Sequence, residues 1–183
     1  QTLAAAPDDV AAWLNRGNSL LGLGDLQASH TQDDAARSSY AAAIASFEKA
    51  LERAPDDPEA HNNLGNGWQR LGRLQAARER ADEALESCRK AESAYVEAER
   101  RAPDDPAVRN NLGSALQGTG EALASLGRHE EALAAYRRAI EAYAKDSGHA
   151  QGNALSRQGD LLERIGRYEE AAESYRAGIA ALE

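Results

Sequence analysis

The sequence contains no methionine, one cysteine and one phenylalanine in 183 residues. The lone thiol of Cys88 rules out an internal disulfide. We expect this thiol to be structural; it leaves the compartment open, although a cytoplasmic setting fits. No apolar run approaches the roughly 18 residues that a membrane helix needs, so we expect no membrane partner. β-Branched residues are scarce and alanine is abundant, a balance that favours helix over sheet.

Positive charge is also in short supply, because 21 Lys and Arg oppose 30 Asp and Glu, for a formal net charge of −9. An acidic chain lacks the basic surface that nucleic acid requires, so we expect no nucleic-acid partner. Gln1 stands first and no signal peptide is recognisable. We therefore expect a processed chain or an excised piece of a longer one.

An internal repeat organises what is present. The tripeptide Pro-Asp-Asp begins at Pro7, Pro55 and Pro103, which sets a 48-residue period. Two further sets of residues follow the same period: Asn15, Asn63 and Asn111, and Gly17, Gly65 and Gly113. Such a period indicates a stack of similar units, each of which buries its apolar face only against its neighbours.

The spacing of small and aromatic residues inside each unit resembles the tetratricopeptide repeat (TPR), a helix-turn-helix unit of about 34 residues. In the second unit the matching residues are Leu64, Gly65, Trp68, Ala91, Tyr95, Ala98 and Pro103. In the first they are Trp13, Gly17, Leu20, Ala43, Phe47, Ala50 and Pro55. The third unit has Leu112, Gly113, Leu116, Ala132, Tyr136 and Ala139, and the fourth has Gly159, Leu162, Ala171, Tyr175 and Gly178.

The resemblance covers essentially the whole chain and implies an all-α fold: an α-solenoid of stacked antiparallel helix hairpins in a right-handed superhelix. We therefore expect one array of eight helices and no strand. Its units should occupy about residues 8–55, 56–103, 104–149 and 150–183, with residues 1–7 as the helical remnant of a preceding repeat.

The repeats are longer than the family's unit by about 14 residues, or four helical turns. Two added turns in each helix would keep the faces of a hairpin in register. In the first unit, Thr31-Gln32-Asp33-Asp34 has the pattern of a capping box, so we expect helices over 8–29 and 32–54. In the second unit, the aligned turn is at 80–82.

The third and fourth units differ from the first two. In the third, the seven-residue excess between Gly120 and Gly127 predicts that only the first helix is longer, over 106–126. The fourth has the family's ordinary spacing. The Pro-Asp-Asp-Pro segments offer Asp57 and Asp105 as helix N-caps, an explanation that we prefer to metal binding.

In the family, the first helix of each unit lines a concave groove, and the resemblance implies the same here. Three units place an asparagine at one groove position. A side-chain amide both donates and accepts hydrogen bonds, so such asparagines can hold an extended peptide backbone. The peptide-binding residues that we predict are Asn15, Asn18, Asn62, Asn63, Asn66, Gln69, Arg70, Asn110, Asn111, Ser114, Gln117 and Arg157.

This asparagine ladder makes the chain a protein-interaction scaffold with a protein or peptide partner. The alternative is a structural spacer or self-assembly arm of a larger protein, with nothing in the groove. The ladder requires accessible, unpaired asparagines, whereas a spacer predicts hydrogen bonds between neighbouring repeats. Grooves of the family that grip a terminal carboxylate use lysines of the first helix; here Lys49, Lys90 and Lys145 all fall on second helices.

No chemistry beyond binding is expected. The four histidines have no metal-ligand spacing to one another or to Cys88, so we predict neither cofactor nor metal nor enzymatic activity. The last helix carries Tyr175, Ile179 and Leu182, which no later helix in this sequence covers. We therefore predict end-to-end contacts between molecules.

Overall fold

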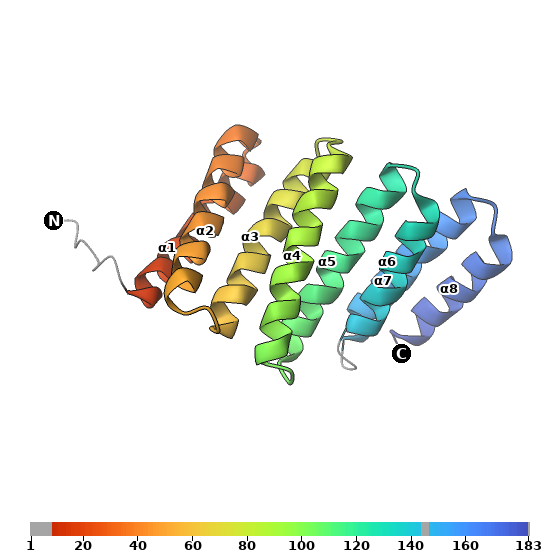
Figure 1. Cartoon of the computed structure of the whole chain (residues 1–183). Coiled ribbons are helices and arrows are strands. Elements are labelled where there is room, and N and C mark those ends of the chain that lie inside the picture. Colours follow the sequence, from red (N-terminus) through yellow and green to blue (C-terminus); the bar gives the residue numbers. More distant parts are fainter. Residues whose placement is uncertain (1–8, 144–146, 183) are drawn as a thin grey trace.

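The computed structural model describes residues 9–143 and 147–182, in which helices are the only regular elements. These helices are α1 (Val10–Ser29), α2 (Asp33–Arg53), α3 (Pro58–Ala76), α4 (Ala81–Arg101), α5 (Pro106–Ser125), α6 (His129–Ala142), α7 (Gly148–Arg164) and α8 (Tyr168–Ala180) (Figure 1). The expected all-α solenoid is confirmed. The predicted helical remnant in residues 1–7 lies outside the described residues.

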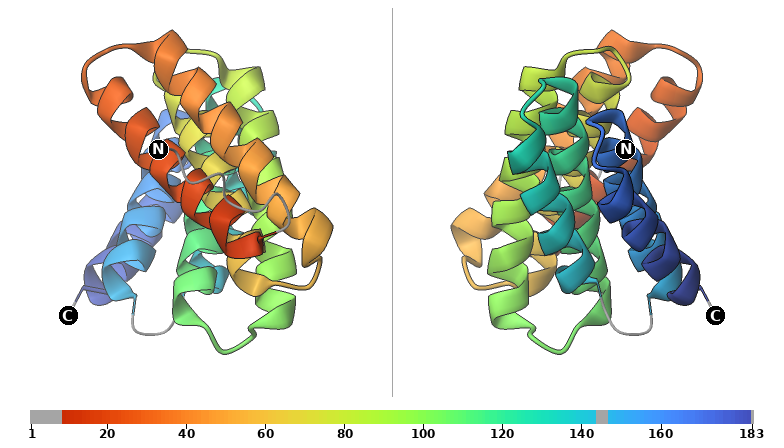
Figure 2. Two further views of the ribbon diagram at one scale, coloured as in Figure 1. Left: turned by 90° about the vertical axis from the view of Figure 1, so that its left-hand side faces the viewer. Right: turned by 90° about the vertical axis from the view of Figure 1, so that its right-hand side faces the viewer.

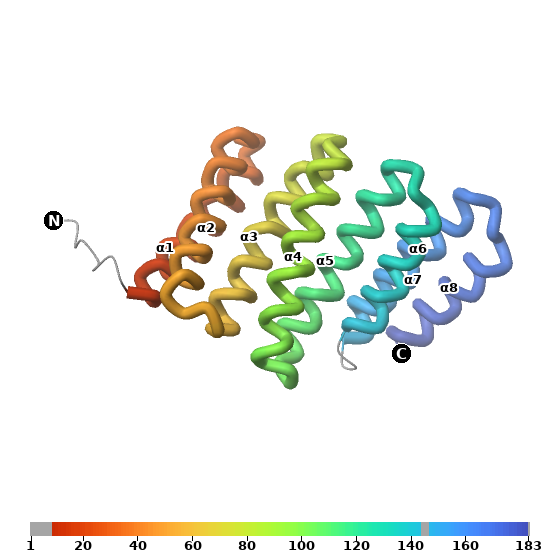
Figure 3. Tube along the Cα trace, in the orientation of Figure 1, coloured from red at the N-terminus to blue at the C-terminus, as the bar shows by residue number. Residues whose placement is uncertain are grey.

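Successive helices pair into four antiparallel hairpins that stand side by side in a row (Figure 3). The first helices, α1, α3, α5 and α7, form one layer, and each contacts the next. The second helices form the other layer, and no two of them are in contact within the described part of the chain. The layer of first helices is therefore the inner, concave one. Views along the row show each hairpin rotated against its neighbour (Figure 2).

Each hairpin closes through a turn in which one residue has a positive φ: Thr31, Glu79, Gly127 and Gly166. Two glycines precede each of these residues at constant spacing, about two and about four helical turns earlier. The glycines farther from the turn form a lower tier of contacts, Gly17 on Phe47, Gly65 on Tyr95, Gly113 on Tyr143 and Gly152 on Leu182. The glycines nearer the turn form the upper tier, Gly24 on Tyr40, Gly72 on Cys88, Gly120 on Tyr136 and Gly159 on Tyr175.

These contacts need glycine because the two helices approach too closely for a side chain. A Cβ atom added to Gly65 would lie 2.6 Å from the Tyr95 ring, and one added to Gly120 would lie 2.7 Å from the Tyr136 ring. Alanines pack around each contact. Ala43, Ala91 and Ala139 are fully buried at the 48-residue period, and Ala36, Ala84 and Ala132 are at most 1% exposed.

The two tiers correct the register predicted for the third hairpin. The 48-residue period continues from Tyr95 to Tyr143, which packs on Gly113 as Tyr95 packs on Gly65. The prediction that only the first helix is longer is confirmed, because α5 has 20 residues and α6 has 14, but the predicted pairing of Tyr136 with Gly113 is wrong. Tyr136 belongs to the upper tier, and α6 merely ends sooner than its counterparts.

The fourth hairpin is also shifted from its predicted alignment. The turn residues Gly127 and Gly166 are closer together than one period, and Gly159 precedes Gly166 as Gly120 precedes Gly127. Gly159 therefore corresponds to Gly120 rather than to Gly113. When residues are counted back from the turn, each groove position of α7 lies seven residues earlier in the sequence than predicted. Asn153 is therefore the counterpart of Ser114 in α5. The hairpin keeps both tiers, and its helices are shorter only at the end away from the turn.

The turns use backbone hydrogen bonds in place of the predicted capping box. In the first turn, Gln32 N–H donates to Gln27 O at 2.9 Å, and Thr31 N–H donates to Ala28 O at 3.1 Å. This is the Schellman arrangement, which requires a left-handed residue after the helix. The Thr31 hydroxyl donates to His30 O and caps nothing, so the predicted capping box is wrong.

The second turn has the same arrangement at 77–80, two to three residues before the predicted place. At the opposite ends of the hairpins, the predicted N-caps are confirmed. Asp57 accepts the N–H of Glu59 at 2.9 Å, and Asp105 accepts that of Ala107 at 2.8 Å.

We expect Thr31→Gly to stabilise the chain by about 1 kcal/mol, because a β-branched residue is strained at a positive φ and glycine is not. The greater freedom of glycine in the unfolded chain offsets part of the gain. The matched control is Gly127→Ala, which should lower stability by a similar amount. Urea denaturation followed by circular dichroism measures both; an unchanged or lower midpoint for Thr31→Gly would contradict the strain argument.

Candidate functional site: the concave groove

The predicted binding residues all lie on the four inner helices, but they differ in accessibility. On α1, Asn15 and Asn18 are exposed, and so is Arg157 on α7. Asn63 on α3 is only 8% exposed. The others are half-buried: Asn62, Asn66, Gln69, Arg70, Asn110, Asn111, Ser114 and Gln117.

Several of the half-buried side chains bond across neighbouring repeats. The Asn111 amide donates to Asn62 Oδ1 at 2.9 Å, and the Gln69 amide donates to the Ser114 hydroxyl at 2.7 Å. Both bonds join α3 to α5. The buried Asn63 faces Asn66, whose Nδ2 lies 3.4 Å from Asn63 Oδ1. Asn62 and Asn111 therefore serve a contact between repeats, as the spacer alternative requires, whereas Asn63 and Asn66 meet within α3.

Tyrosines of the lower tier hold the groove carboxamides in place. The Tyr95 hydroxyl donates to Asn66 Oδ1 at 2.9 Å and to Gln69 Oε1 at 3.0 Å. The Tyr143 hydroxyl donates to Gln117 Oε1 at 3.2 Å. Burial raises the pKa of Tyr95 and raises that of Tyr143 to about 12, so both phenols remain donors at neutral pH. The amide N–H₂ groups of Gln69 and Gln117 are thereby turned away from the tyrosines.

A cavity of about 500 Å³ opens between α3, α5 and α7. Among the predicted residues, it is lined by Gln69, Asn110, Ser114, Gln117 and Arg157. Sequence reasoning missed Arg73, Cys88 and Glu121, which also line it. Arg73 and Glu121 lie on the turns of helix that lengthen these repeats, for which the family's shorter unit offers no aligned position. The 48-residue period was the available signal.

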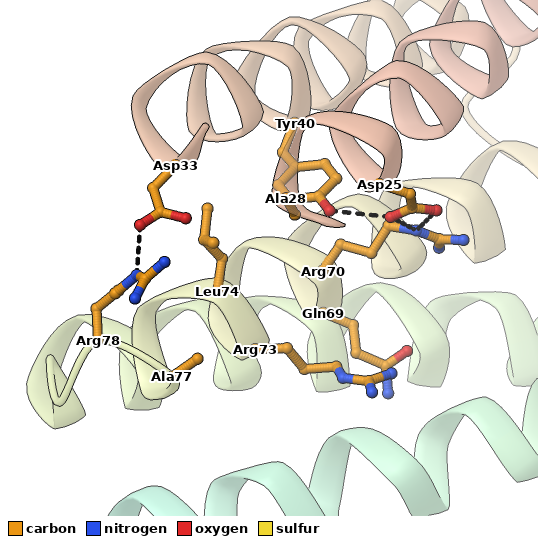
Figure 4. Close-up of a pocket in the computed structure, with 10 residues that line it drawn as sticks. All are labelled: Asp25, Ala28, Asp33, Tyr40, Gln69, Arg70, Arg73, Leu74, Ala77 and Arg78. Carbon is orange, nitrogen blue, oxygen red and sulfur yellow. Dashed lines mark hydrogen bonds and ion pairs between the residues drawn. The ribbon is translucent and has the colours of Figure 1, made fainter. Parts of the chain in front are cut away.

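A second cavity, of about 520 Å³, lies between the first two hairpins in the upper tier (Figure 4). Arg70 reaches across it to Asp25, with Nε 2.9 Å from both carboxylate oxygens, and Asp25 also accepts the Tyr40 hydroxyl at 2.9 Å. Arg78 pairs with Asp33 on the other side. Burial, with the Asp25 hydrogen bond, raises the pKa of Tyr40 to about 12. These ion pairs tie hairpin 2 to hairpin 1.

The two cavities adjoin each other, because Gln69 and Arg73 line both of them. Figure 4 shows the Arg73 side chain extending beside Gln69, while Arg70 reaches toward Asp25. Arg73 is exposed, and Arg157 lines the cavity between α3, α5 and α7, with Nε 3.5 Å from Glu121 Oε1. The groove thus offers amide donors and acceptors together with arginine side chains.

Cys88 occupies the upper tier of hairpin 2, where hairpins 1 and 3 have Tyr40 and Tyr136. It is 4% exposed, and burial beside the carboxylates of Glu92 and Glu121 raises its pKa to about 12. A thiol with this pKa stays protonated at neutral pH and is a poor nucleophile. It is a packing residue, as the sequence predicted.

Two further kinds of site find no support in the part of the chain that the structure describes. In residues 9–143 and 147–182, no group of three His, Cys, Asp or Glu side chains is placed to hold a metal ion. None of the described helices combines the length and apolarity needed to cross a membrane.

Models of one family match most of the chain. A tetratricopeptide repeat model matches residues 104–183, a TPR repeat model matches 33–72, and a further tetratricopeptide repeat model matches 60–94. A search of curated proteins found no significant match.

Solved structures of similar fold include BtubC (BKLC) from P. vanneervenii. It has a TM-score of 0.57 and 16% identity, over 97% of this chain and 74% of that one. The N-terminal domain of stress-induced protein-1 (STI-1) from C. elegans has a TM-score of 0.50 and 15% identity, over 82% of this chain and 97% of that one. At such identities the likeness concerns the fold alone.

We expect Asn111→Ala to lower the free energy of unfolding by about 1 kcal/mol, because it removes the hydrogen bond to Asn62 between repeats. The matched control is Asn15→Ala, which changes the aligned but exposed residue of α1 and should leave stability unchanged. Chemical denaturation of both variants measures the difference. Equal stabilities would show that the bond between repeats contributes nothing.

Proposed function

Because the chain belongs to the tetratricopeptide repeat family and is a protein-interaction scaffold, we propose that its concave groove binds an extended segment of a partner protein. The observation that carries the proposal is that two adjoining cavities share Gln69 and Arg73. Adjoining cavities in a row suit an extended chain, which advances about 3.3 Å per residue.

The asparagine ladder enters this proposal in a modified form. Side chains committed to contacts between repeats, such as Asn62 and Asn111, build the wall of the groove. Recognition of the peptide backbone falls to amides that remain accessible: Asn15 and Asn18 on α1, and Asn153 on α7. Each can donate to a backbone carbonyl and accept from a backbone N–H.

Arginines add a preference for acceptor groups. Arg73 projects into the middle of the groove and Arg157 lies at its α7 side. Guanidinium groups present several donors in a plane and bind carboxylates or backbone carbonyls well. A bound segment would therefore place carbonyl or carboxylate oxygens near Arg73.

The second candidate is a structural spacer, which the bonds between α3 and α5 favour. Asn111 with Asn62 and Gln69 with Ser114 join consecutive repeats and need no ligand. The two functions differ in what they require of Arg73 and Asn153. A spacer has no use for either side chain.

We expect the double variant Arg73→Ala, Asn153→Ala to weaken peptide binding at least about tenfold, because each lost hydrogen bond costs on the order of 1 kcal/mol. Twelve-residue peptides are first selected on the wild-type chain from a random phage-displayed library. Their dissociation constants are then measured by fluorescence anisotropy.

The control is Ser93→Ala, Arg137→Ala, which changes two exposed residues on α4 and α6, away from the groove. It should bind the selected peptides as the wild-type chain does. A selection that yields no binders, or binders that tolerate the groove variant, would favour the spacer.

A further inference from the structure

Neighbouring hairpins make a recurring contact between the second helix of one and the first helix of the next. On α2, Ile44 is 5% exposed and packs on α3, where a Cβ atom added to Gly67 would lie 2.8 Å from it. On α6, the half-buried Ile140 packs against the core that α6 shares with α7. At these two junctions the outer layer therefore contributes an isoleucine, whereas between α4 and α5 the equivalent residue is Glu92, which accepts the Thr119 hydroxyl.

The equivalent surface of α8 is open. Counted from the turn, Ile179 of α8 corresponds to Ile140 of α6, and it is 61% exposed. Leu182, which follows α8 and packs on Gly152, is 53% exposed. This face has the chemistry that α2 uses to bind α3.

The complementary surface of α1 is open as well. Leu23 is 45% exposed and Leu26 is 57% exposed. Their counterparts one period later, Leu71 and Leu74, pack into the core between hairpins 1 and 2. The next counterparts, Thr119 and Ala122, are each 4% exposed. Ser19 occupies the place of Gly67, so α1 also keeps a small residue where an isoleucine would pack.

We infer that α8 of one molecule packs on α1 of a second copy, repeating between molecules the contact that joins α2 to α3 within one. The occupant is a second copy because both halves of the internal contact are exposed on the same chain, at opposite ends of the row (Figure 1). The contact joins two different surfaces, so it is heterologous and extends head to tail. It leaves the concave groove free and does not depend on the proposed function.

Charged substitutions in the two surfaces test this arrangement. Leu26→Glu places a negative charge in the apolar surface of α1, and Ile179→Glu places one in the apolar surface of α8. Sedimentation equilibrium over about 10 µM to 1 mM, a range suited to a small and weak contact, should show the wild-type chain growing in mean mass beyond a dimer. Each variant alone should remain monomeric.

An equimolar mixture of the two variants gives the decisive result. One variant retains a working α8 surface and the other a working α1 surface, so the mixture should form a dimer and nothing larger. The matched control is Val96→Glu on α4, which adds the same charge at a residue 45% exposed and should assemble as the wild-type chain does. Circular dichroism checks that all variants are folded.

Several outcomes would overturn the inference. A wild-type chain that stays monomeric at all concentrations has no such contact. A Leu26→Glu variant that dimerises by itself would mean that α8 pairs with α8. Loss of assembly in Val96→Glu would mean that net charge, rather than these two surfaces, controls association.

Discussion

The close approach of two helices at glycine is the contact on which the rest of the structure depends. Each hairpin closes where an aromatic ring, or Cys88 or Leu182 in its place, lies directly on a glycine of the partner helix. This contact fixes the distance between the layers and the height at which each side chain stands. The tyrosine hydroxyls that position the groove amides follow from it, because the same rings that fill the hairpins reach through to Asn66, Gln69 and Gln117.

Much of this architecture could be predicted from the sequence. The 48-residue period, the aspartate caps and the separation into inner and outer helices follow from patterns that repeat at fixed spacing. The tier to which Tyr136 and Tyr175 belong could not be predicted. The residues around each of these tyrosines match the family pattern in either tier. The position of the turn determines the tier. Two of the turns are hard to recognise in the sequence because Thr31 and Glu79, rather than glycine, adopt the positive φ.

The groove residues show a different limit. Their placement on the inner helices followed from the period, but their hydrogen-bond partners did not. Asn111 bonds to Asn62, the residue next to its aligned counterpart Asn63. The side chains of Arg73 and Glu121 were missed because they stand on the added turns of helix.

The added tier changes the height of the inner wall. Two turns of α-helix rise about 10 Å, whereas paired strands lie about 4.8 Å apart. A hairpin with one tier has an inner wall tall enough for a single extended peptide segment. The cavity around Arg70 and Arg73 lies nearer the hairpin turns than Asn62 and Asn111 do. The inner wall is therefore tall enough for two extended segments side by side. A partner that enters as a β-hairpin-like loop would contact this wall with both of its strands.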